Sequence, residues 1–445
     1  MNPKINDSDI GKRPDRFALF FSAVMAGAFL VVVLIGLFSD LGLHPDEWDV
    51  KVCLDYGMTH YFPPDMRAPG LGDTYSWYGY TKLDNYTWYF FLAGKVALLF
   101  KHLLPSLPYY RIPNILLFAA IALILVRNIR RKKWLAVAFG ICVQAWYIFS
   151  YTTADALDFF WSFLAVFLLA DENSLLYRTV NAQKITPRHI AASAVLGILF
   201  GMIALGKPNY LSVLALAFFV LLFRLIWEKE KKARRCLWRN YFIITGFFAL
   251  TFFFRFSFDL VHYGFDKASV SEQMAIQYAS PDKNPLTPIE EQSVSWHMMS
   301  KGATLGDFFA ENPEWFSMTY KSFCGITPLT DTDTWYYIAM GILYAAILAC
   351  IGIHTFRQPD FARGRLEFII GTLLMAGGLV ASVLNSYIID SQAQGRYLLP
   401  LILIAGYLAG QAPGLFESRM FRAMLIAAGF LSVAFFGLRG VPMFL

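Results

Sequence analysis

Hydrophobic segments of 16 to 22 residues recur along the chain, separated by polar segments that are rich in Lys and Arg. Because a helix needs ~20 mainly apolar residues to cross a bilayer, each segment predicts a membrane-spanning helix. The sequence therefore predicts an all-α polytopic membrane protein with about eleven transmembrane helices. The predicted spans are 17–38, 111–127, 134–150, 156–171, 190–206, 209–226, 241–257, 335–353, 366–384, 397–415 and 421–437.

The basic residues predict how these spans are oriented. Six loops that alternate with the other connections carry 23 of the 38 Lys and Arg residues, whereas the short loop 150–156 carries none. Lys and Arg concentrate on the cytoplasmic side of membrane proteins, so we expect a cytoplasmic N-terminus and a C-terminus outside. The basic loops are 1–16, 127–133, 171–189, 227–240, 354–365 and 416–422.

Two segments on the predicted outer side are long, and they divide the chain into parts. The second of them contains helical runs around 268–278 and 289–300 between several prolines. We expect a partly ordered cap over the outer face. The parts are a cytoplasmic tail (1–16), a transmembrane module (17–257) that includes the outer loop 39–110, a periplasmic loop (258–334), and C-terminal transmembrane helices (335–445).

The apolar stretch 86–104 in the first outer loop has two interpretations. It is long enough to be a twelfth span, but a span there would move the basic cluster 127–133 to the outside. We therefore predict a helix that lies in the membrane interface, with Lys95, Lys101 and His102 reaching towards water.

Composition supports the membrane assignment and excludes other classes. The chain of 445 residues is 57% hydrophobic and only 16% charged, whereas soluble domains carry about 25% charged residues. We interpret the net charge of +6 as a consequence of topology and expect no nucleic-acid partner. The five cysteines lack metal-binding spacing; Cys53 and Cys324 would both lie outside, and the sequence leaves open whether they pair.

A polar stretch follows the first span and reads His44-Pro45-Asp46-Glu47-Trp48. Pro45 suits the start of a helix, and an apolar stripe of Trp48, Val52 and Tyr56 predicts a short interfacial helix that Gly57 ends. Asp46 and Glu47 would then lie in its first turn, where free N–H groups and the helix dipole favour ionised carboxylates. Such a carboxylate beside the membrane is suited to act as a general base, although capping of the helix is the alternative reading.

Further charged residues fall at the same predicted level, the outer membrane surface. Asp155 opens the fourth span, Lys207 lies in a tight hairpin, Arg255 ends the seventh span, and Arg396 begins the tenth. Each alone has a structural explanation, such as capping a helix or anchoring the end of a span. Ionisable groups at membrane depth are costly and face a cavity or each other, so their convergence on one face favours a functional site.

The combination of acids and cations has a chemical meaning. Cations at the outer surface can hold a lipid-linked phosphate, and a carboxylate can deprotonate an acceptor hydroxyl. A glycosidase instead needs two opposed carboxyl groups, and neighbours such as Asp46 and Glu47 point about 100° apart on a helix. Their carboxylates are also candidate oxygen ligands for a divalent cation such as Mg²⁺ or Mn²⁺.

The order of these features resembles the GT-C superfamily of multi-spanning glycosyltransferases, of the protein O-mannosyltransferase and aminoarabinose transferase kind. More closely, the chain resembles a bacterial family of membrane proteins thought to be glycosyltransferases of cell-surface polysaccharides. That family carries an early Asp-Glu, a Ser-x-x-x-Ala-Asp-Ala-like turn, a Lys-Pro-x-Tyr hairpin and a late Gln-Gly-Arg-Tyr-x-x-Pro. The corresponding residues here are Asp46-Glu47, 150–156, 207–210 and 394–400.

The resemblance implies roles for individual residues. Asp46 would be the catalytic base, and Lys207 and Arg396 would hold the donor phosphate. Residues 84–88 depart from the His-Pro-Pro-Leu-like entry to the interfacial helix, so acceptor recognition is not implied. Our candidate catalytic residues are Asp46, Glu47 and Asp155. Our candidate substrate-binding residues are Lys207, Arg396, Arg255, Tyr210, Tyr397, His44 and Trp48.

The predicted function is transfer of a sugar from a polyprenyl-phosphate carrier to a cell-surface glycan or lipid acceptor. The predicted location is the bacterial inner membrane, with the site facing the periplasm or the cell exterior. One alternative is a polysaccharide polymerase or ligase that uses diphosphate-linked glycans. The other is a lipid-linked sugar transporter or flippase, although such proteins favour repeats and broken helices at the membrane centre, and the sequence shows no repeat.

Overall fold

The computed structural model describes residues 15–326, 333–358 and 362–445, and its regular elements are all helices. Within these ranges, extended backbone pairs only in two isolated β-bridges. The predicted all-α class is therefore confirmed. Most of the predicted tail 1–16 lies outside the described residues.

Seven of the described helices are long and apolar enough to cross a membrane, and each coincides with a predicted span. α18 continues through a π-helical turn into α19 (Val441–Phe444). These are the helices of a membrane protein. The seven are α1 (Arg16–Phe38), α9 (Pro187–Leu205), α10 (Leu211–Trp227, after a 3₁₀ turn at Pro208–Tyr210), α11 (Lys231–Tyr263), α15 (Thr334–Arg357), α16 (Ala362–Ile388) and α18 (Arg419–Phe435).

The other four predicted spans are helical but shorter. They comprise α4 (Ile112–Asn128), α7 (Asp155–Leu169), α17 (Leu399–Gln411) and the segment 134–150. That last segment is not one helix, because extended backbone at Cys142 divides it into α5 and α6. Both pieces, α5 (Leu135–Phe139) and α6 (Val143–Tyr147), are buried along their whole length in the centre of the bundle.

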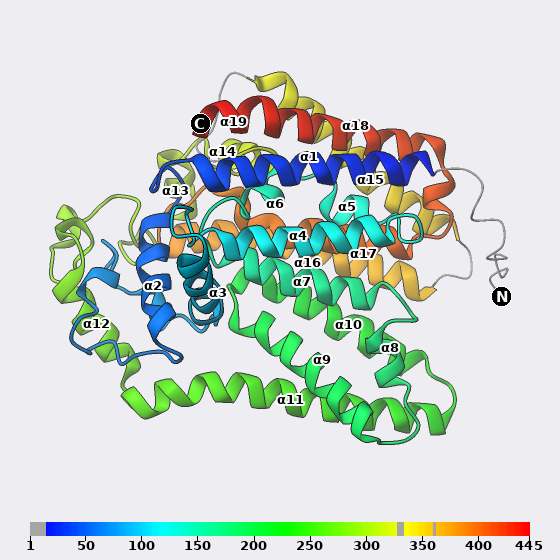
Figure 1. Ribbon diagram of the computed structural model, residues 1–445, viewed down its shortest axis with the longest axis horizontal. Coiled ribbons are helices and arrows are strands. Elements are labelled where there is room, and N and C mark those ends of the chain that lie inside the picture. The colour runs from blue at the N-terminus through cyan, green and yellow to red at the C-terminus, as the bar shows by residue number, and fades with distance from the viewer. Residues whose placement is uncertain (1–14, 327–332, 359–361) are drawn as a thin grey trace.

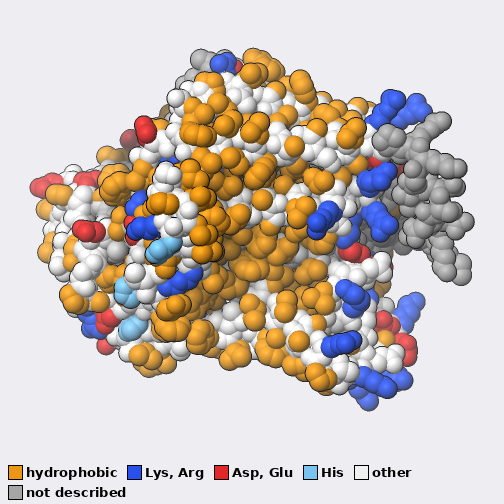
Figure 2. Space-filling model, viewed as in Figure 1, with side chains coloured by type: hydrophobic (Ala, Val, Ile, Leu, Met, Phe, Trp, Pro, Cys, Tyr) orange, Lys and Arg blue, Asp and Glu red, His pale blue; other side chains and the backbone are white. Residues whose placement is uncertain are grey.

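The two ends of the helix bundle differ in kind. The long helices run roughly side by side, and the two long loop segments lie together at the left end in Figure 1, which we call the loop end (residues 39–110 and 258–326). Figure 2 shows Lys and Arg gathered at the opposite end, with a broad hydrophobic band between the ends. This distribution agrees with a bundle whose middle faces lipid and whose ends face water.

The first long loop is built on two helices that cross closely. α2 (Glu47–Thr59) packs against α3 (Tyr89–Leu103), and both lie at the loop end without following the axis of the bundle (Figure 1). Gly57 was expected to end α2, but it lies inside the helix at the crossing. A Cβ there would lie 2.0 Å from the carbonyl oxygen of Phe90, so only glycine allows this approach.

The buried face of α2 is not the predicted apolar stripe. Trp48, the first residue of that stripe, is 61% exposed. Val50, Leu54 and Met58 are buried instead, in a core shared with α3. The stripe correctly predicted a short helix, but only Tyr56 of its three residues packs against this core, because the crossing with α3 turns Val50, Leu54 and Met58 inwards.

The second long loop covers the first. It contains α12 (Lys267–Tyr278), which confirms the helix predicted around 268–278, and then α13 (Leu305–Glu311) and α14 (Trp315–Cys324). The helix predicted over 289–300 is wrong, because only the 3₁₀ turn Ile289–Glu291 forms there. The backbone N–H groups of His297 and Met299 donate instead to the carbonyl oxygens of Ile389 and Tyr387 at the end of α16.

Candidate functional site

Four segments bring charged side chains together at the loop end of the bundle. We call this group the carboxylate–cation cluster: Asp46, Lys82, Asp155, Lys207 and Arg396. Asp46 and Lys82 come from the first loop, Asp155 from the start of α7, Lys207 from the hairpin after α9, and Arg396 from the turn before α17. Four of the five were expected to share one face of the membrane, and the structure places them in contact.

Asp46 lies at the rim of the cluster in an unusual backbone conformation. It is the residue before α2 and has a φ of 58°, a left-handed value that is uncommon for residues other than glycine. Its Oδ2 lies 2.7 Å from Nη2 of Arg396 and 3.7 Å from Nζ of Lys82. Its Oδ1 has no hydrogen-bond partner among the described residues, and 44% of the side chain is exposed. One oxygen of this carboxylate is thus available to a ligand.

The electrostatic surroundings keep Asp46 ionised. Burial raises the pKa of its carboxyl group, but the charge of Arg396 and then that of Lys82 act in the opposite direction. The net effect holds the pKa of Asp46 well below its ordinary value. At neutral pH the residue is therefore a proton acceptor.

Arg396 lies in the 3₁₀ turn Gly395–Leu398, and its position depends on the glycine before it. A Cβ on Gly395 would lie 2.1 Å from the backbone nitrogen of Phe323, so the turn can approach α14 only without a side chain. The guanidinium is almost completely buried, and its Nη1 lies 3.8 Å from Oδ2 of Asp155. Its Nε has no partner among the described residues.

Asp155 and Lys207 form the buried side of the cluster. Nζ of Lys207 donates to Oδ2 of Asp155 at 2.7 Å, and the hydroxyl of Thr153 donates to the same oxygen at 3.1 Å. The other oxygen of Asp155, Oδ1, is fully buried and unpaired within the described part of the chain. The backbone N–H of Lys207 donates to Asp158 at 3.0 Å, which fixes the hairpin.

Two tyrosines support the cluster from opposite sides. The hydroxyl of Tyr210 is buried and donates to the carbonyl oxygen of Asp155 at 3.4 Å, so it faces the backbone and not the open side. The ring of Tyr397 lies beside both cations, with its centre 5.5 Å from the guanidinium carbon of Arg396 and 6.0 Å from Nζ of Lys207. Tyr397 is thus the tyrosine that borders the charged groups.

Lys82 was missed by the sequence analysis. It belongs to a 3₁₀ turn, Lys82–Asp84, in an irregular part of the first loop, where no periodic pattern marks its direction. Burial lowers the pKa of Lys82, and the attraction of Asp46 opposes that effect. With Lys82 the cluster has three cations and two carboxylates, so the site has an excess of positive charge that suits an anion.

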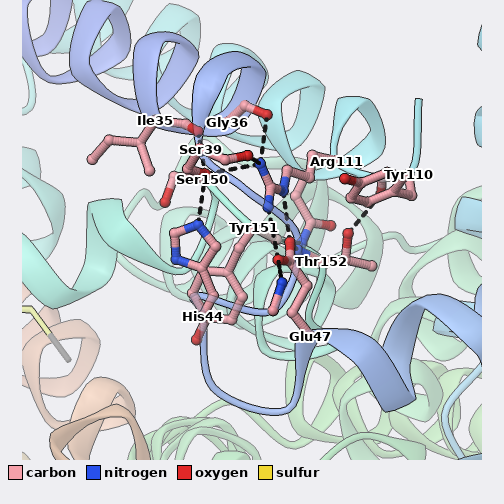
Figure 3. Close-up of polar contacts among 12 residues, drawn as sticks. Ile35, Gly36, Ser39, His44, Glu47, Tyr110, Arg111, Ser150, Tyr151 and Thr152 are labelled. Atoms are coloured by element: carbon pink, nitrogen blue, oxygen red, sulfur yellow. Dashed lines mark hydrogen bonds and ion pairs between the residues drawn. The ribbon is translucent and has the colours of Figure 1, made fainter. Parts of the chain in front are cut away.

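Glu47 is the sequence neighbour of Asp46 but belongs to a different group. Its two oxygens accept from Nε and Nη2 of Arg111 at 2.6 and 2.7 Å, and Oε1 also accepts from the backbone N–H of Thr152 at 3.1 Å. Arg111 in turn donates to the carbonyl oxygens of Ser39 and Asp40 at 2.7 and 3.0 Å. Figure 3 shows the guanidinium between Glu47 and the end of α1. This pair fastens the first loop to the bundle.

His44 belongs to the same fastening. Its Nε2 is 2.9 Å from the hydroxyl of Ser39, its Nδ1 is 2.8 Å from the hydroxyl of Tyr147, and its ring stacks on Tyr151. Burial, and then the charge of Arg111, lowers the pKa of His44 to about 3. The imidazole is therefore a neutral hydrogen-bonded bridge and does not face the cluster.

Arg255 and Trp48 also lie apart from the cluster. Arg255 on α11 pairs with Asp259 at 2.9 Å and donates to the carbonyl oxygens of Asp84 and Asn85 at 3.2 and 2.8 Å. It therefore joins the end of α11 to the first loop. Trp48 is exposed on the surface of α2.

The acid pair does not fit a shared divalent cation. Both oxygens of Glu47 are bonded to Arg111, and Asp46 faces Arg396. Among the described residues, no group of three or more His, Cys, Asp and Glu side chains has the proximity that a metal ion needs. Cys53 and Cys324 are buried free thiols that do not pair with each other.

Sequence comparisons with known proteins found no match, so the functional assignment depends on the site. No protein-family model matches the chain, and no curated protein is significantly similar in sequence. The resemblance to GT-C glycosyltransferases thus rests on the order of the sequence features, and the resemblance to the bacterial family rests on four short motifs. Each of the four motifs contributes one charged side chain to the cluster, and these are Asp46, Asp155, Lys207 and Arg396.

Proposed function

We propose that this chain is a membrane glycosyltransferase of the GT-C type, which moves a sugar from a polyprenyl-phosphate carrier to a glycan or lipid acceptor. The observation that carries the proposal is the carboxylate–cation cluster. Its cations outnumber its carboxylates, and buried Oδ1 of Asp155 and Nε of Arg396 have no partner in the described ranges. Unpaired buried polar atoms are costly, which favours a bound ligand at this point.

The donor phosphate fits the cationic side of the cluster. Arg396 offers a planar fork to two phosphate oxygens, and Lys207 and Lys82 add point charges. Oδ2 of Asp155 accepts a hydrogen bond of 2.7 Å from Nζ of Lys207, so Asp155 positions one of the cations that would hold the phosphate. Its unpaired Oδ1 is available to orient a hydroxyl of the acceptor. The polyprenyl tail of the donor would remain in the bilayer beside the bundle.

Asp46 acts as the general base of the transfer. Its free Oδ1 takes the proton from the acceptor hydroxyl. At the same time, the oxygen of this hydroxyl forms a bond to the anomeric carbon of the donor sugar. The bond between the anomeric carbon and the phosphate oxygen breaks, and its electron pair goes to the phosphate, where Arg396 and Lys207 stabilise the charge. The products are the glycosylated acceptor and polyprenyl phosphate, and the proton leaves Asp46 to solvent.

Donor binding would strengthen this base. In the structure, Arg396 is shared between Asp46 and Asp155. A phosphate that binds Arg396 competes for the same N–H groups and adds negative charge beside Asp46. Both changes raise the pKa of Asp46 from its lowered value, and a base with a higher pKa accepts a proton more readily.

The membrane setting is part of the proposal. The basic end of the bundle would face the cytoplasm and the loop end would face the periplasm of a bacterial inner membrane, with the shorter helices completing eleven spans. The donor would then be used outside the cytoplasm, where carriers of this kind present their head groups to enzymes on the outer side.

A second candidate function shares the same cluster. Three cations in one cluster can also neutralise a diphosphate, the anchor that polysaccharide polymerases and ligases use. The two functions differ in their products, because a transferase adds one sugar whereas a polymerase or ligase changes the length or attachment of a whole chain.

Loss of the gene tests the proposal in the cell. We expect mass spectrometry of surface glycans and lipids to show loss of one sugar residue, together with accumulation of its polyprenyl-phosphate form, and the wild-type gene should restore both. Shortened or unattached chains would favour the diphosphate alternative. Accumulation of the lipid-linked sugar on the cytoplasmic side instead of the outer side would favour a flippase and overturn the proposal, and unchanged surface glycans would contradict it as well.

A further inference from the structure

A cavity opens at the loop end, outside the carboxylate–cation cluster. Its volume is about 500 Å³, which is within the ~300–1,000 Å³ range of small-molecule sites. It lies between the first loop, the segment that follows α12, and the end of α16. We call it the loop pocket. Side chains that determine its chemistry are Tyr78, Tyr80, Lys283, Trp296, His297 and Lys301.

Aromatic rings form one wall of the loop pocket. The ring centres of Tyr78 and Trp296 are 5.2 Å apart, and those of Tyr78 and Tyr80 are 5.6 Å apart in a stacked arrangement. The hydroxyl of Tyr78 donates to Asp390 at 2.6 Å, which fixes the ring. Rigid aromatic faces with few rotatable bonds suit the apolar C–H faces of sugar rings.

Two cations line the loop pocket. Nζ of Lys283 lies 5.1 Å from the ring centre of Tyr78 and 5.2 Å from that of Trp296, and the side chain is almost completely buried. Oδ2 of the partly exposed Asp282 lies 3.6 Å from this Nζ. Lys301 is a second cation in the lining, and its ammonium donates to the carbonyl oxygen of Ser293. No Asp or Glu lines the pocket among the described residues. Both cations keep N–H groups for an anionic ligand.

The backbone that carries this wall is strained. His297 has a φ of 51°, one of two positive values found for non-glycine residues in the described ranges, and the other belongs to Asp46. The N–H of His297 donates to the carbonyl oxygen of Ile389 at 2.8 Å, which holds the segment on the end of α16. Strain of this kind persists where surrounding contacts enforce it, and such residues concentrate at functional sites.

The loop pocket adjoins the part of the first loop that reaches Asp46, because Tyr80 lies two residues before Lys82, whose Nζ is 3.7 Å from Oδ2 of Asp46. Tyr80 lines the pocket, and its pKa is raised by burial first and next by the negative charge of Asp46. The pKa of Tyr78 is raised by burial and Asp390, with a further contribution from Asp46. The tyrosine wall is therefore within electrostatic reach of the carboxylate that has a free oxygen.

We infer that the loop pocket binds sugar rings that carry an anionic group, and that it holds the acceptor while one hydroxyl reaches Asp46. The second half of this inference rests on the proposed transferase function, whereas the first half does not. The anionic group is a carboxylate or a phosphate, because a buried Lys recognises either one. The aromatic wall accounts for recognition of the sugar itself.

Binding to the purified full-length protein in lipid nanodiscs tests the inference. Three probes are titrated by calorimetry: trigalacturonate, neutral galactotriose and galactose 6-phosphate. We expect an anionic probe to bind at least 10-fold more tightly than galactotriose. The anionic probe that binds more tightly shows whether the recognised group is a carboxylate or a phosphate. Equal affinities for all three probes, or no binding of any probe, would overturn the inference.

Variants locate the binding in the loop pocket. Lys283→Met removes the charge and keeps the length, so it should weaken the anionic probe about 10- to 100-fold without changing galactotriose binding. If Lys283→Met lowers the melting temperature, Lys301→Met is used to test the same loss of affinity for the anionic probe. Lys101→Met, at an exposed position near the end of α3, is the matched control and should bind as the wild type does. Unchanged affinity in both pocket variants would place the site elsewhere.

Asp46→Asn separates the two proposals. This variant should bind the anionic probe as the wild type does, because Asp46 does not line the pocket. Normal probe binding by a wild-type protein that transfers no sugar would overturn the proposed function and leave the first half of the inference standing. Transfer that depends on Asp46, in a protein whose loop pocket binds no sugar, would overturn the inference alone.

Discussion

Two adjacent carboxylates lie in environments that differ in almost every respect. Glu47 is fully buried, and both of its oxygens are bonded to Arg111. Asp46 is partly exposed, shares Arg396 with another acid, and has one free oxygen. The first pair is closed and fastens the loop to the bundle, whereas the second is open and lies among unpaired buried groups. An ion pair in a membrane protein can therefore be a structural contact or part of a binding site, and the hydrogen-bonding capacity that its atoms retain distinguishes the two.

Breaking the closed pair should have the largest effect on stability. Glu47→Gln leaves the buried guanidinium of Arg111 without its counter-charge, and loss of one partner of a buried pair costs ~3–5 kcal/mol. We expect a much lower melting temperature in detergent and less protein in the membrane. Asp55→Asn is the control, because the Lys51–Asp55 pair joins successive turns of the same helix at a partly exposed position, and an i,i+4 pair on a helix contributes ~0.3–0.5 kcal/mol. Equal losses in both variants would remove the special role of Glu47.

Weakening the open cluster should affect donor binding instead. Arg396→Lys replaces a planar fork by a point charge, and Lys207→Ala removes a cation. A hydrogen bond to a charged group is worth ~1.5–3 kcal/mol, so the apparent dissociation constant of the lipid donor should rise roughly 10- to 150-fold. The measurement is a titration of polyprenyl-phosphate sugar against each purified variant. If both donor curves match that of the wild type, these residues do not belong to the site.

The difference between the two regions was only partly predictable. Hydrophobic periodicity and the basic loops placed Asp46, Asp155, Lys207 and Arg396 at one end of the bundle, because topology alone decides that level. Topology does not decide the direction of a side chain. The separation of Asp46 from its neighbour depends on one left-handed backbone residue and on the position of Arg111.

Irregular backbone explains the other differences. Lys82 was missed because it lies in a short 3₁₀ turn, whose side-chain direction follows from tertiary contacts and not from a period. Gly57 was taken as the end of a helix because glycine ends many helices, yet here it allows two helices to touch. His44 was expected to contact the substrate, but its neighbours Ser39 and Tyr147 satisfy both ring nitrogens.

The closed region should also respond to pH through His44. Its pKa is lowered from 6.5 to about 3, so the unfolded chain takes up a proton near pH 6.5 that the folded protein accepts only near pH 3. The stability from neutral His44 is complete above pH 6.5 and is lost progressively as the pH falls towards 3. Melting temperatures should therefore fall less steeply over this range in His44→Gln than in the wild type. His60→Gln, at an exposed position, should follow the wild-type curve.

The open region should show a smaller effect of pH on activity. Lys82 contributes to the lowered pKa of Asp46, so Lys82→Met should raise that pKa. Asp46 must be ionised to accept a proton, and activity is lost as the pH falls through its pKa. The acid limb of kcat/KM should thus move to higher pH in Lys82→Met. Arg67→Met, which removes a cation from the exposed pair with Asp65 elsewhere in the same loop, should leave the limb in place.

The most direct test of the account is the transfer rate of Asp46→Asn, measured together with its melting temperature on one preparation in lipid nanodiscs. Asparagine keeps the shape of the side chain but cannot accept a proton, and a positioned base contributes ~10²–10⁴-fold. Asp73→Asn, an exposed acid of the same loop, is the matched control. The account predicts a loss of that size at a wild-type melting temperature, with the control unaffected. Full transfer by Asp46→Asn, or a loss fully explained by unfolding, would contradict it.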